Sequence, residues 1–345
     1  MLNVSYLQII LAIAGALAVL ALMLIYLLIR KIIEQRRKAR LQSMKEKIRP
    51  LLMKEMIHGD DEGLKLMKKD QTFIAAVEDI LKNYGVNIDS SSFKRNIPET
   101  AEKYLSAYLI KGLDSSRWAD RMNTLMVIKD FQIYSFVPTL WERYDKARTS
   151  PQERNLILQT AAGADDPKML VVLLSSPPYQ SIFFYKQIIR RASSDTLTTM
   201  ISRFRELPPA FQVAVLSFIG ETRDLSLLPF TESCLQSGDH EVRVNAVKAI
   251  RNIGFLSKPQ ALYPFAASDS WVEQMSFAQA AGEVVHPGYR EMLIELLASS
   301  NWWVRYYAGE ALSKYKDGKM ILEDAAANHQ DAFARDMASQ WLGSV

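Results

Sequence analysis

The longest apolar stretch of the chain lies near its N-terminus. Residues 6–29 read YLQIILAIAGALAVLALMLIYLLI, in which Gln8 is the one strongly polar side chain and no residue is charged. About 24 residues at about 1.5 Å each give about 36 Å of helix, enough to cross a hydrocarbon core of about 30 Å. A lone segment in lipid must satisfy its own backbone hydrogen bonds, which only a helix does. The pattern predicts a single transmembrane helix over residues 6–29.

A cleaved signal peptide is the alternative to an anchor. Residues 1–5 contain no Lys or Arg, however, and the apolar run is longer than the core of a usual signal peptide. Basic residues follow the run directly, namely Arg30, Lys31, Arg36, Arg37, Lys38 and Arg40. By the positive-inside rule this asymmetry places the N-terminus outside and the rest of the chain, with the repeat domain described below, in the cytoplasm. We therefore expect a single-pass protein of the cell membrane.

The positive charge of the chain is concentrated just after the apolar run. Residues 30–54 carry ten Lys or Arg against two Glu, a net charge of +8, whereas the whole chain has +4, so the rest is at −4. Apolar residues such as Ile33 and Leu41 interrupt the charges. One interpretation is a segment that lies on an anionic membrane surface, with the six basic residues named above against lipid headgroups. The other is a solvated stalk that only sets the topology.

Beyond residue 95 the chain is a succession of short amphipathic segments separated by Pro, Gly, Asp and Ser, which predicts an all-helical fold. In residues 238–254, GDHEVRVNAVKAIRNIG, Asp239 can cap a helix. Its apolar side chains recur three and four positions apart on one helical face, at Val242, Ala246, Ala249, Ile250 and Ile253. The layout returns three times, and its marker positions are Arg243, Glu273, Arg305 and Arg335. A period of 30 to 32 residues between these markers is typical of a solenoid.

This pattern of a polar cap, a Val-Arg pair, two small residues three apart and a closing aliphatic residue resembles the HEAT repeat family, particularly its short bacterial, phycobilisome-lyase-like form. The resemblance covers about residues 114–345 and is strong at 238–254 and 300–315. Elsewhere it weakens, because Glu273 replaces the usual Arg and the units before residue 205 lack the Val-Arg pair. It implies an α-solenoid of antiparallel helix pairs, each of which buries its apolar face against its neighbours.

Four segments follow from these patterns. We expect the N-terminus and transmembrane helix in residues 1–29, a basic juxtamembrane segment in 30–54, a helical cap or small separate bundle in 55–113, and the HEAT-like solenoid in 114–345.

Few residues suggest chemistry. The four histidines are scattered, and no phosphate-binding loop or nucleophile elbow occurs in the sequence. Asp165 and Asp166 precede a proline, which favours a helix cap over a metal site, and Cys234, the single cysteine, lies among apolar residues, which favours a buried thiol over a nucleophile. We expect no catalytic residue, metal or cofactor. Because residues beyond the basic segment are net acidic, we expect no nucleic-acid partner either.

Aromatic residues stand at or near the starts of the expected first helices of the pairs, at Trp118, Trp271, Trp302, Trp303, Tyr306 and Tyr307. In a solenoid these starts share one edge, and Trp and Tyr are favoured anchors at protein interfaces. We therefore regard these six as candidate partner-binding residues. Packing between repeats is the alternative, although the adjacent Trp302 and Trp303 cannot both face the core equally.

Taken with the membrane helix, these features predict a non-enzymatic scaffold. It would be held in the lipid bilayer by residues 6–29 and would bind or position a protein partner, whose identity the sequence does not give, at the cytoplasmic membrane face. The alternatives are an enzyme or lyase on a HEAT-like scaffold, and an accessory subunit of a membrane enzyme complex such as a glycosyltransferase system.

Overall fold

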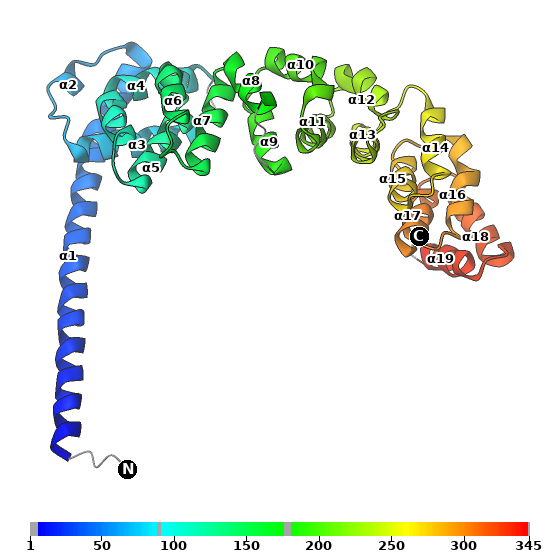
Figure 1. Cartoon of the computed structure of the whole chain (residues 1–345), viewed down its shortest axis with the longest axis horizontal. Helices are drawn as coiled ribbons and strands as arrows, with labels where there is room; N and C mark the ends of the chain where they lie inside the picture. The colour runs from blue at the N-terminus through cyan, green and yellow to red at the C-terminus, as the bar shows by residue number, and fades with distance from the viewer. Residues whose placement is uncertain (1–5, 88–90, 176–180, 344–345) are drawn as a thin grey trace. The chain divides into compact units, whose positions relative to one another are not determined.

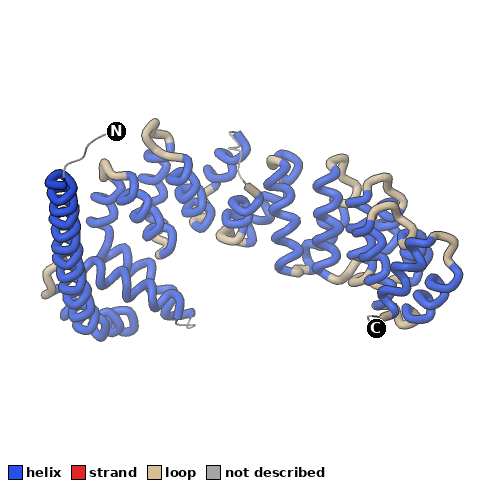
Figure 2. Tube along the Cα trace, turned by 90° about the horizontal axis from the view of Figure 1, so that it is seen from below, coloured by secondary structure: helices blue, strands red, loops and turns tan. Residues whose placement is uncertain are grey.

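The computed structural model describes residues 6–87, 91–175 and 181–343, so residues 1–5 of the first predicted segment lie outside the described ones. All regular secondary structure in these ranges is helical, and no strand occurs in them (Figure 2). The prediction of an all-α protein is therefore confirmed. The chain forms two compact units, the N-terminal unit of residues 1–157 and the C-terminal unit of residues 158–345.

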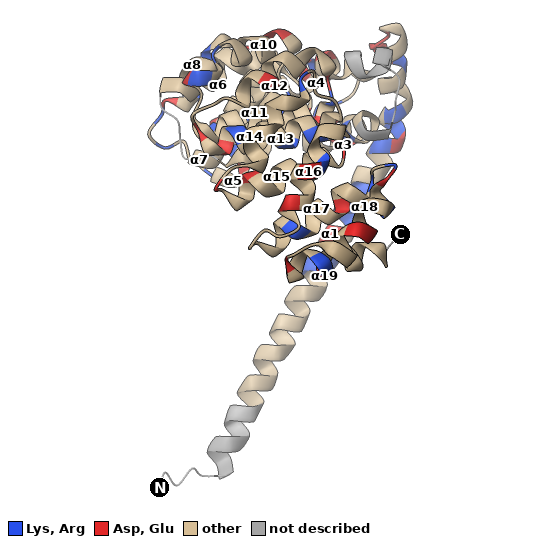
Figure 3. Cartoon of the chain, turned by 90° about the vertical axis from the view of Figure 1, so that its right-hand side faces the viewer, with Lys and Arg blue, Asp and Glu red and all other residues tan. Residues whose placement is uncertain are grey.

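The N-terminal unit begins with one uninterrupted helix, α1 (Tyr6–His58), of 53 residues. From Leu17 to Ile29 its large apolar side chains are all exposed. Figure 3 shows this part of α1 without any Lys, Arg, Asp or Glu. Within the described residues α1 is the one helix long and apolar enough to cross a membrane. The predicted long apolar N-terminal helix is thus present, and it continues through the basic segment without a break.

The remaining helices of this unit follow α1 in the sequence. They are α2 (Glu62–Lys65), α3 (Gln71–Asn87), α4 (Ser91–Leu113), α5 (Trp118–Asp130), the 3-10 helix η1 (Tyr134–Phe136), α6 (Val137–Tyr144) and α7 (Pro151–Gly163), which crosses into the second unit. The last turns of α1 contact α2, α3 and α4, and α3 and α4 contact each other. Ile48 and Leu52 of α1 are fully buried there, as are Phe73 and Val77 of α3. Burial of these apolar side chains fixes the end of α1 to the unit.

The C-terminal unit continues this all-helical succession. Its helices are α8 (Pro167–Ser175), α9 (Ile182–Ile189), α10 (Ser194–Ser202), η2 (Phe204–Glu206), α11 (Pro209–Thr222), η3 (Leu225–Leu227), α12 (Leu228–Cys234), α13 (His240–Ile253), η4 (Pro259–Leu262), α14 (Tyr263–Ala266), α15 (Trp271–Ala281), η5 (Pro287–Tyr289), α16 (Arg290–Leu296), α17 (Trp302–Ser313), α18 (Gly318–Asn328) and α19 (Ala332–Leu342).

Within this unit the helices form two rows. From α9 to α19 every odd-numbered helix contacts the next odd-numbered one, and α12, α14, α16 and α18 each contact the odd-numbered helix that follows (Figure 1). Small residues allow the odd-numbered helices to approach closely: a Cβ atom on Gly220 of α11 would lie 3.0 Å from Cα of Ala249 in α13, and one on Gly282 would lie 3.2 Å from Cα of Ala311 in α17. Larger side chains at these glycines would separate the helices.

A repeated side-chain contact defines the register of the odd-numbered helices. The Nη1 atom of an arginine donates to the backbone oxygen six residues earlier in the pairs Arg121 with Ser115, Arg243 with Ser237, Arg305 with Ser299 and Arg335 with His329, at 3.2, 2.9, 2.7 and 2.8 Å. The contact satisfies a carbonyl group in the turn that precedes the helix. In α15 it is Gln274 Nε2 that makes this bond, with Ser268 O at 2.8 Å.

The prediction that Glu273 occupies the marker position was therefore wrong. Gln274 takes it, so the marker residues 243, 274, 305 and 335 are 31, 31 and 30 apart, more regular than the sequence pattern indicated. The error arose because Val272-Glu273 resembles the Val-Arg pair in polarity, whereas the position is defined by a donor side chain. Glu273 cannot donate as a carboxylate.

Candidate partner-binding site

Four aromatic residues that the sequence analysis named lie together on the first two turns of α17. Asn301 caps this helix, accepting a hydrogen bond from Trp303 N at 2.9 Å. Residues four apart lie on the same side of a helix. Accordingly the Trp302 ring stacks on Tyr306, with centroids 5.1 Å apart, and the Trp303 ring stacks on Tyr307 at 6.3 Å. The two tryptophans remain 44% and 50% exposed, so packing between helices covers only about half of each.

The neighbouring helix α19 supports this cluster from one side. Trp341 lies 5.1 Å from the Tyr306 ring, and its Nε1 donates to the Tyr306 backbone oxygen at 3.1 Å. Gly309 makes room for the indole, because a Cβ atom at this position would overlap the Trp341 ring. The rings of α17 are thus held in fixed positions while their outer faces remain open to solvent.

Phe333 extends the exposed aromatic surface onto α19. Its side chain is 61% exposed, and the Arg305 guanidinium lies 4.9 Å from its ring centroid, a cation–π contact. Sequence reasoning missed Phe333 and Trp341. The repeat pattern could have indicated Phe333, because Phe333 is the second residue of α19 and Trp303 is the second residue of α17. We call Trp302, Trp303, Tyr306, Tyr307 and Phe333 the aromatic patch.

The other two predicted aromatic residues are placed differently. Trp271 is the exposed first residue of α15, the position that Trp302 holds in α17. Trp118 is the exposed first residue of α5 and belongs to the N-terminal unit, where its Nε1 donates to Ser150 Oγ at 3.1 Å. The edge formed by helix starts is not continuously aromatic, because α13 begins with His240 and Glu241.

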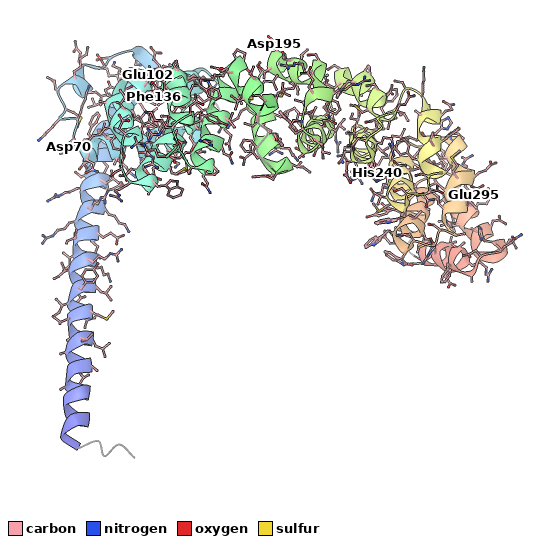
Figure 4. The ribbon with its side chains drawn as sticks, viewed as in Figure 1. Asp70, Glu102, Phe136, Asp195, His240 and Glu295 are labelled. Carbon is pink, nitrogen blue, oxygen red and sulfur yellow. The ribbon has the colours of Figure 1, made fainter. Side chains whose placement is uncertain are left out.

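A charged cluster joins the first turns of α13 and α15. Figure 4 labels His240, which belongs to this cluster. Glu273 accepts hydrogen bonds from Arg243 Nη2 at 2.7 Å and from Ser268 Oγ at 2.6 Å, and its Oε1 lies 3.0 Å from His240 Nδ1. Burial acts to raise the pKa of Glu273, but the hydrogen bonds from Ser268 and Arg243 outweigh it and hold this pKa below its usual value of 4.5. The cluster is a structural link between helices.

A pH dependence follows from this link. A carboxylate with a lowered pKa in the folded state stabilises that state at pH values above its usual pKa, and the stabilisation is lost as the pH falls through the lowered value. When the pH falls from about 6 to about 3, we expect the full chain with Glu273→Gln to lose less thermal stability than the parent chain. Thermal unfolding in detergent micelles measures it. Equal acid sensitivity of the variant and the parent would contradict the assignment.

The residues considered for chemistry have structural roles in the described part of the chain. Asp166 Oδ1 accepts from Lys168 N at 2.8 Å and so caps the start of α8, whereas Asp165 Oδ1 accepts from Ser193 N at 2.8 Å and so links the turn before α8 to the start of α10. Cys234 is buried, and burial raises its pKa to about 11, which keeps the thiol protonated at neutral pH. No group of three or more His, Cys, Asp or Glu side chains that could hold a metal occurs among the described residues.

All the basic residues predicted to face the membrane are exposed on α1: Arg30, Lys31, Arg36, Arg37, Lys38 and Arg40. Lys38 Nζ pairs with Glu34 one turn earlier at 2.8 Å. Arg36, Arg37 and Arg40 instead line a cavity between α1 and the start of α3. The structure therefore separates the six residues into two groups.

No family model matches the chain, and no curated protein matches it. Solved structures that resemble it include an engineered protein with 18% identity and a TM-score of 0.27, over 87% of this chain and 84% of that one. Human deoxyhypusine hydroxylase in complex with glycerol has 16% identity and a TM-score of 0.29, over 88% of this chain and 96% of its own. A second engineered protein has 16% identity and a TM-score of 0.22, over 77% and 97%. Likenesses at this level assign neither a family nor an activity.

Proposed function

We propose that this protein is a membrane-anchored, non-enzymatic scaffold whose aromatic patch binds a protein partner at the cytoplasmic face of the cell membrane. The observation that carries the proposal is the pair of adjacent, half-exposed tryptophans on α17, held by stacking on Tyr306 and Tyr307. Trp and Tyr are enriched among the residues that dominate binding energy at protein interfaces. Rings that are already fixed lose little conformational entropy on binding.

The scaffold in this proposal is an α-solenoid of HEAT-like helix pairs. Its support is the marker contact that recurs on α5, α13, α15, α17 and α19, together with the succession of contacts between odd-numbered helices. Repeats of this kind present long surfaces made from equivalent positions of successive units. The aromatic patch uses such positions on α17 and α19.

The anchor in this proposal is the apolar part of α1, with the N-terminus outside. Its support is the exposed run of large apolar side chains and the six basic residues that follow it directly. Apolar surface of this extent is unfavourable in water and favourable in lipid. The basic residues favour the cytoplasmic side.

Capture of a partner by the full-length chain, solubilised from membranes in mild detergent, tests the proposal. We expect Trp302→Ala/Trp303→Ala to reduce capture by about 100-fold or more, because truncating a central interface residue costs about 2 kcal/mol or more. Phe255→Ala is the matched control, since Phe255 is a similarly exposed aromatic residue between α13 and η4.

Thermal unfolding of both variants shows whether the fold is kept. Capture that survives the double substitution, or that is lost equally with Phe255→Ala, would exclude the aromatic patch as the binding surface.

A further inference from the structure

A cavity of about 360 Å³ lies between α1 and the start of α3, just beyond the apolar part of α1. Arg36, Arg37 and Arg40 of α1 form one wall, and Gln71 and Thr72 of α3 form the opposite wall. Ile33 lies on its lining as well, one turn nearer the apolar stretch. Two segments more than 30 residues apart in the sequence thus enclose a concave, strongly basic site.

The three arginines of the cavity have no acidic partner within ion-pair distance among the described residues, whereas three of the five lysines in residues 30–54 do. Lys38 pairs with Glu34 at 2.8 Å, Lys45 with Asp79 at 2.7 Å and Lys54 with Asp60 at 2.6 Å. Three unpaired guanidinium groups that line one cavity repel each other, and an anion would relieve that repulsion. Arginine also presents paired N–H groups whose geometry matches a phosphate.

The second and third backbone N–H groups of α3 do not supply this site. Asp70 already accepts from Thr72 N and Phe73 N, each at 2.9 Å, and Figure 4 labels Asp70 beside α1. The positive character of the cavity therefore comes from the arginines. The α3 wall adds the neutral side-chain amide of Gln71 and the hydroxyl of Thr72 as hydrogen-bond donors.

If residues 6–29 span the bilayer, the cavity lies just beyond the lipid headgroups. At about 1.5 Å per residue, Arg36 lies about 10 Å and Arg40 about 16 Å beyond Ile29 along α1. Side chains on a helix lean toward its N-terminus, which here is the membrane side. The guanidinium groups therefore reach back toward the headgroup layer, which extends about 5–8 Å beyond the hydrocarbon core.

The far wall of the cavity is fixed relative to α1. Lys45 Nζ pairs with Asp79 of α3 at 2.7 Å, and Ile48 of α1 and Val77 of α3 are fully buried where the two helices contact. A site whose walls are held together by buried contacts loses little freedom when it is occupied.

We propose that this cavity binds the phosphate group of an anionic membrane lipid, with Arg36, Arg37 and Arg40 as its charged ligands. The proposal rests on the membrane anchor proposed above. A lipid fits the site better than a free anion. The large apolar side chains on the N-terminal side of the cavity along α1 are exposed, and the acyl chains of a bound lipid would lie against them. The bound lipid would set the height and rotation of α1 in the membrane.

Lipid retention by the full-length protein tests this proposal. The protein is reconstituted in nanodiscs of phosphatidylcholine with a minor share of phosphatidylglycerol, released into the gas phase, and the retained lipids are identified by native mass spectrometry. We expect phosphatidylglycerol to be enriched about tenfold over its share in the disc, since a hydrogen bond to a charged group contributes about that factor or more. We expect Arg36→Gln/Arg37→Gln/Arg40→Gln to abolish the enrichment.

Two matched controls distinguish a built site from diffuse attraction. Lys31→Gln/Lys38→Gln/Arg49→Gln removes the same charge from α1 at positions outside the cavity lining and is expected to keep the enrichment. Gln71→Glu adds one negative charge to the α3 wall and is expected to reduce it, whereas Gln35→Glu, nearer the bilayer but outside the cavity lining, is not.

The outcomes separate this proposal from the anchor. Failure of the protein to enter nanodiscs would overturn the anchor, and with it this site. Entry without enrichment, equal loss in both triple variants, or displacement of the lipid by millimolar inorganic phosphate would overturn the lipid site and leave the anchor in place.

Discussion

Replacing Leu20 and Leu24 by arginine is expected to move the protein from the membrane fraction to the soluble fraction. Both side chains are exposed near the middle of the apolar part of α1. An arginine at the centre of a membrane helix costs about 2.5–3.5 kcal/mol on the insertion scale, so two cost about 5–7 kcal/mol. A change of this size lowers partition into the bilayer by more than about 1000-fold.

Fractionation of cells followed by an alkaline carbonate wash measures this partition. Gln35→Arg/Gln42→Arg is the matched control, because it adds the same two arginines to α1 beyond the apolar stretch. The control is expected to remain in the washed membranes. If the Leu20→Arg/Leu24→Arg variant also stayed there, the protein would be held at the membrane by something other than this helix.

Glu153→Gln is expected to destabilise the N-terminal unit by about 3–5 kcal/mol, the cost of removing one partner from a buried ion pair. Glu153 is fully buried at the start of α7. Its Oε1 lies 2.7 Å from Arg121 Nε and 4.0 Å from Arg143 Nε, and both arginines are themselves buried. Without the carboxylate, the buried Arg121 loses its counterion, and the buried Arg143 keeps only the exposed Asp114, whose Oδ1 lies 3.8 Å from Arg143 Nη1.

The environment of Glu153 shows how strongly its charged form is favoured. Burial acts to raise its pKa, but hydrogen bonds from Arg121 and Ser150 outweigh this effect and keep the pKa below its usual value. Glu153 is the buried acid that both arginines share. We expect Glu153→Gln to destabilise the unit more than Arg121→Gln, because Arg143 still balances the carboxylate in the Arg121→Gln variant.

Hydrogen exchange of the α5 and α7 amides in the full chain measures this loss. Glu142→Gln on α6, where the glutamate is exposed, is the matched control and is expected to change the exchange little. Equal protection in the Glu153→Gln and Glu142→Gln variants would show that the buried cluster does not hold these helices together.

The parts of the fold that the sequence predicted are those encoded locally. The long apolar helix could be predicted from the composition of residues 6–29 alone. The predicted cap at Asp239 accepts backbone hydrogen bonds at the start of α13, and Asn301 and Asp331 do the same at the equivalent positions before α17 and α19. The register at Glu273 and Gln274 could not be predicted, because both are long polar side chains and only the turn before α15 decides which one reaches Ser268 O.

In the candidate sites, too, the contacts within one helix could be predicted and the contacts between distant segments could not. Stacking of Trp302 and Trp303 on Tyr306 and Tyr307 follows from a spacing of four residues, which the sequence displays. The support from Trp341 and the cavity between α1 and α3 depend on contacts between segments more than 30 residues apart. A pattern read along one segment does not contain such contacts.

Photocrosslinking in intact cells tests the central claim most directly, because it examines the full-length protein in its place in the cell. The photoreactive residue benzoylphenylalanine replaces Trp303 in one variant and Phe255 in another. The proposed function predicts one defined protein adduct from position 303, recovered in the membrane fraction and lost when Trp302→Ala is added, and no such adduct from position 255. The same products from both positions, or none from position 303, would contradict a partner-binding role for the aromatic patch.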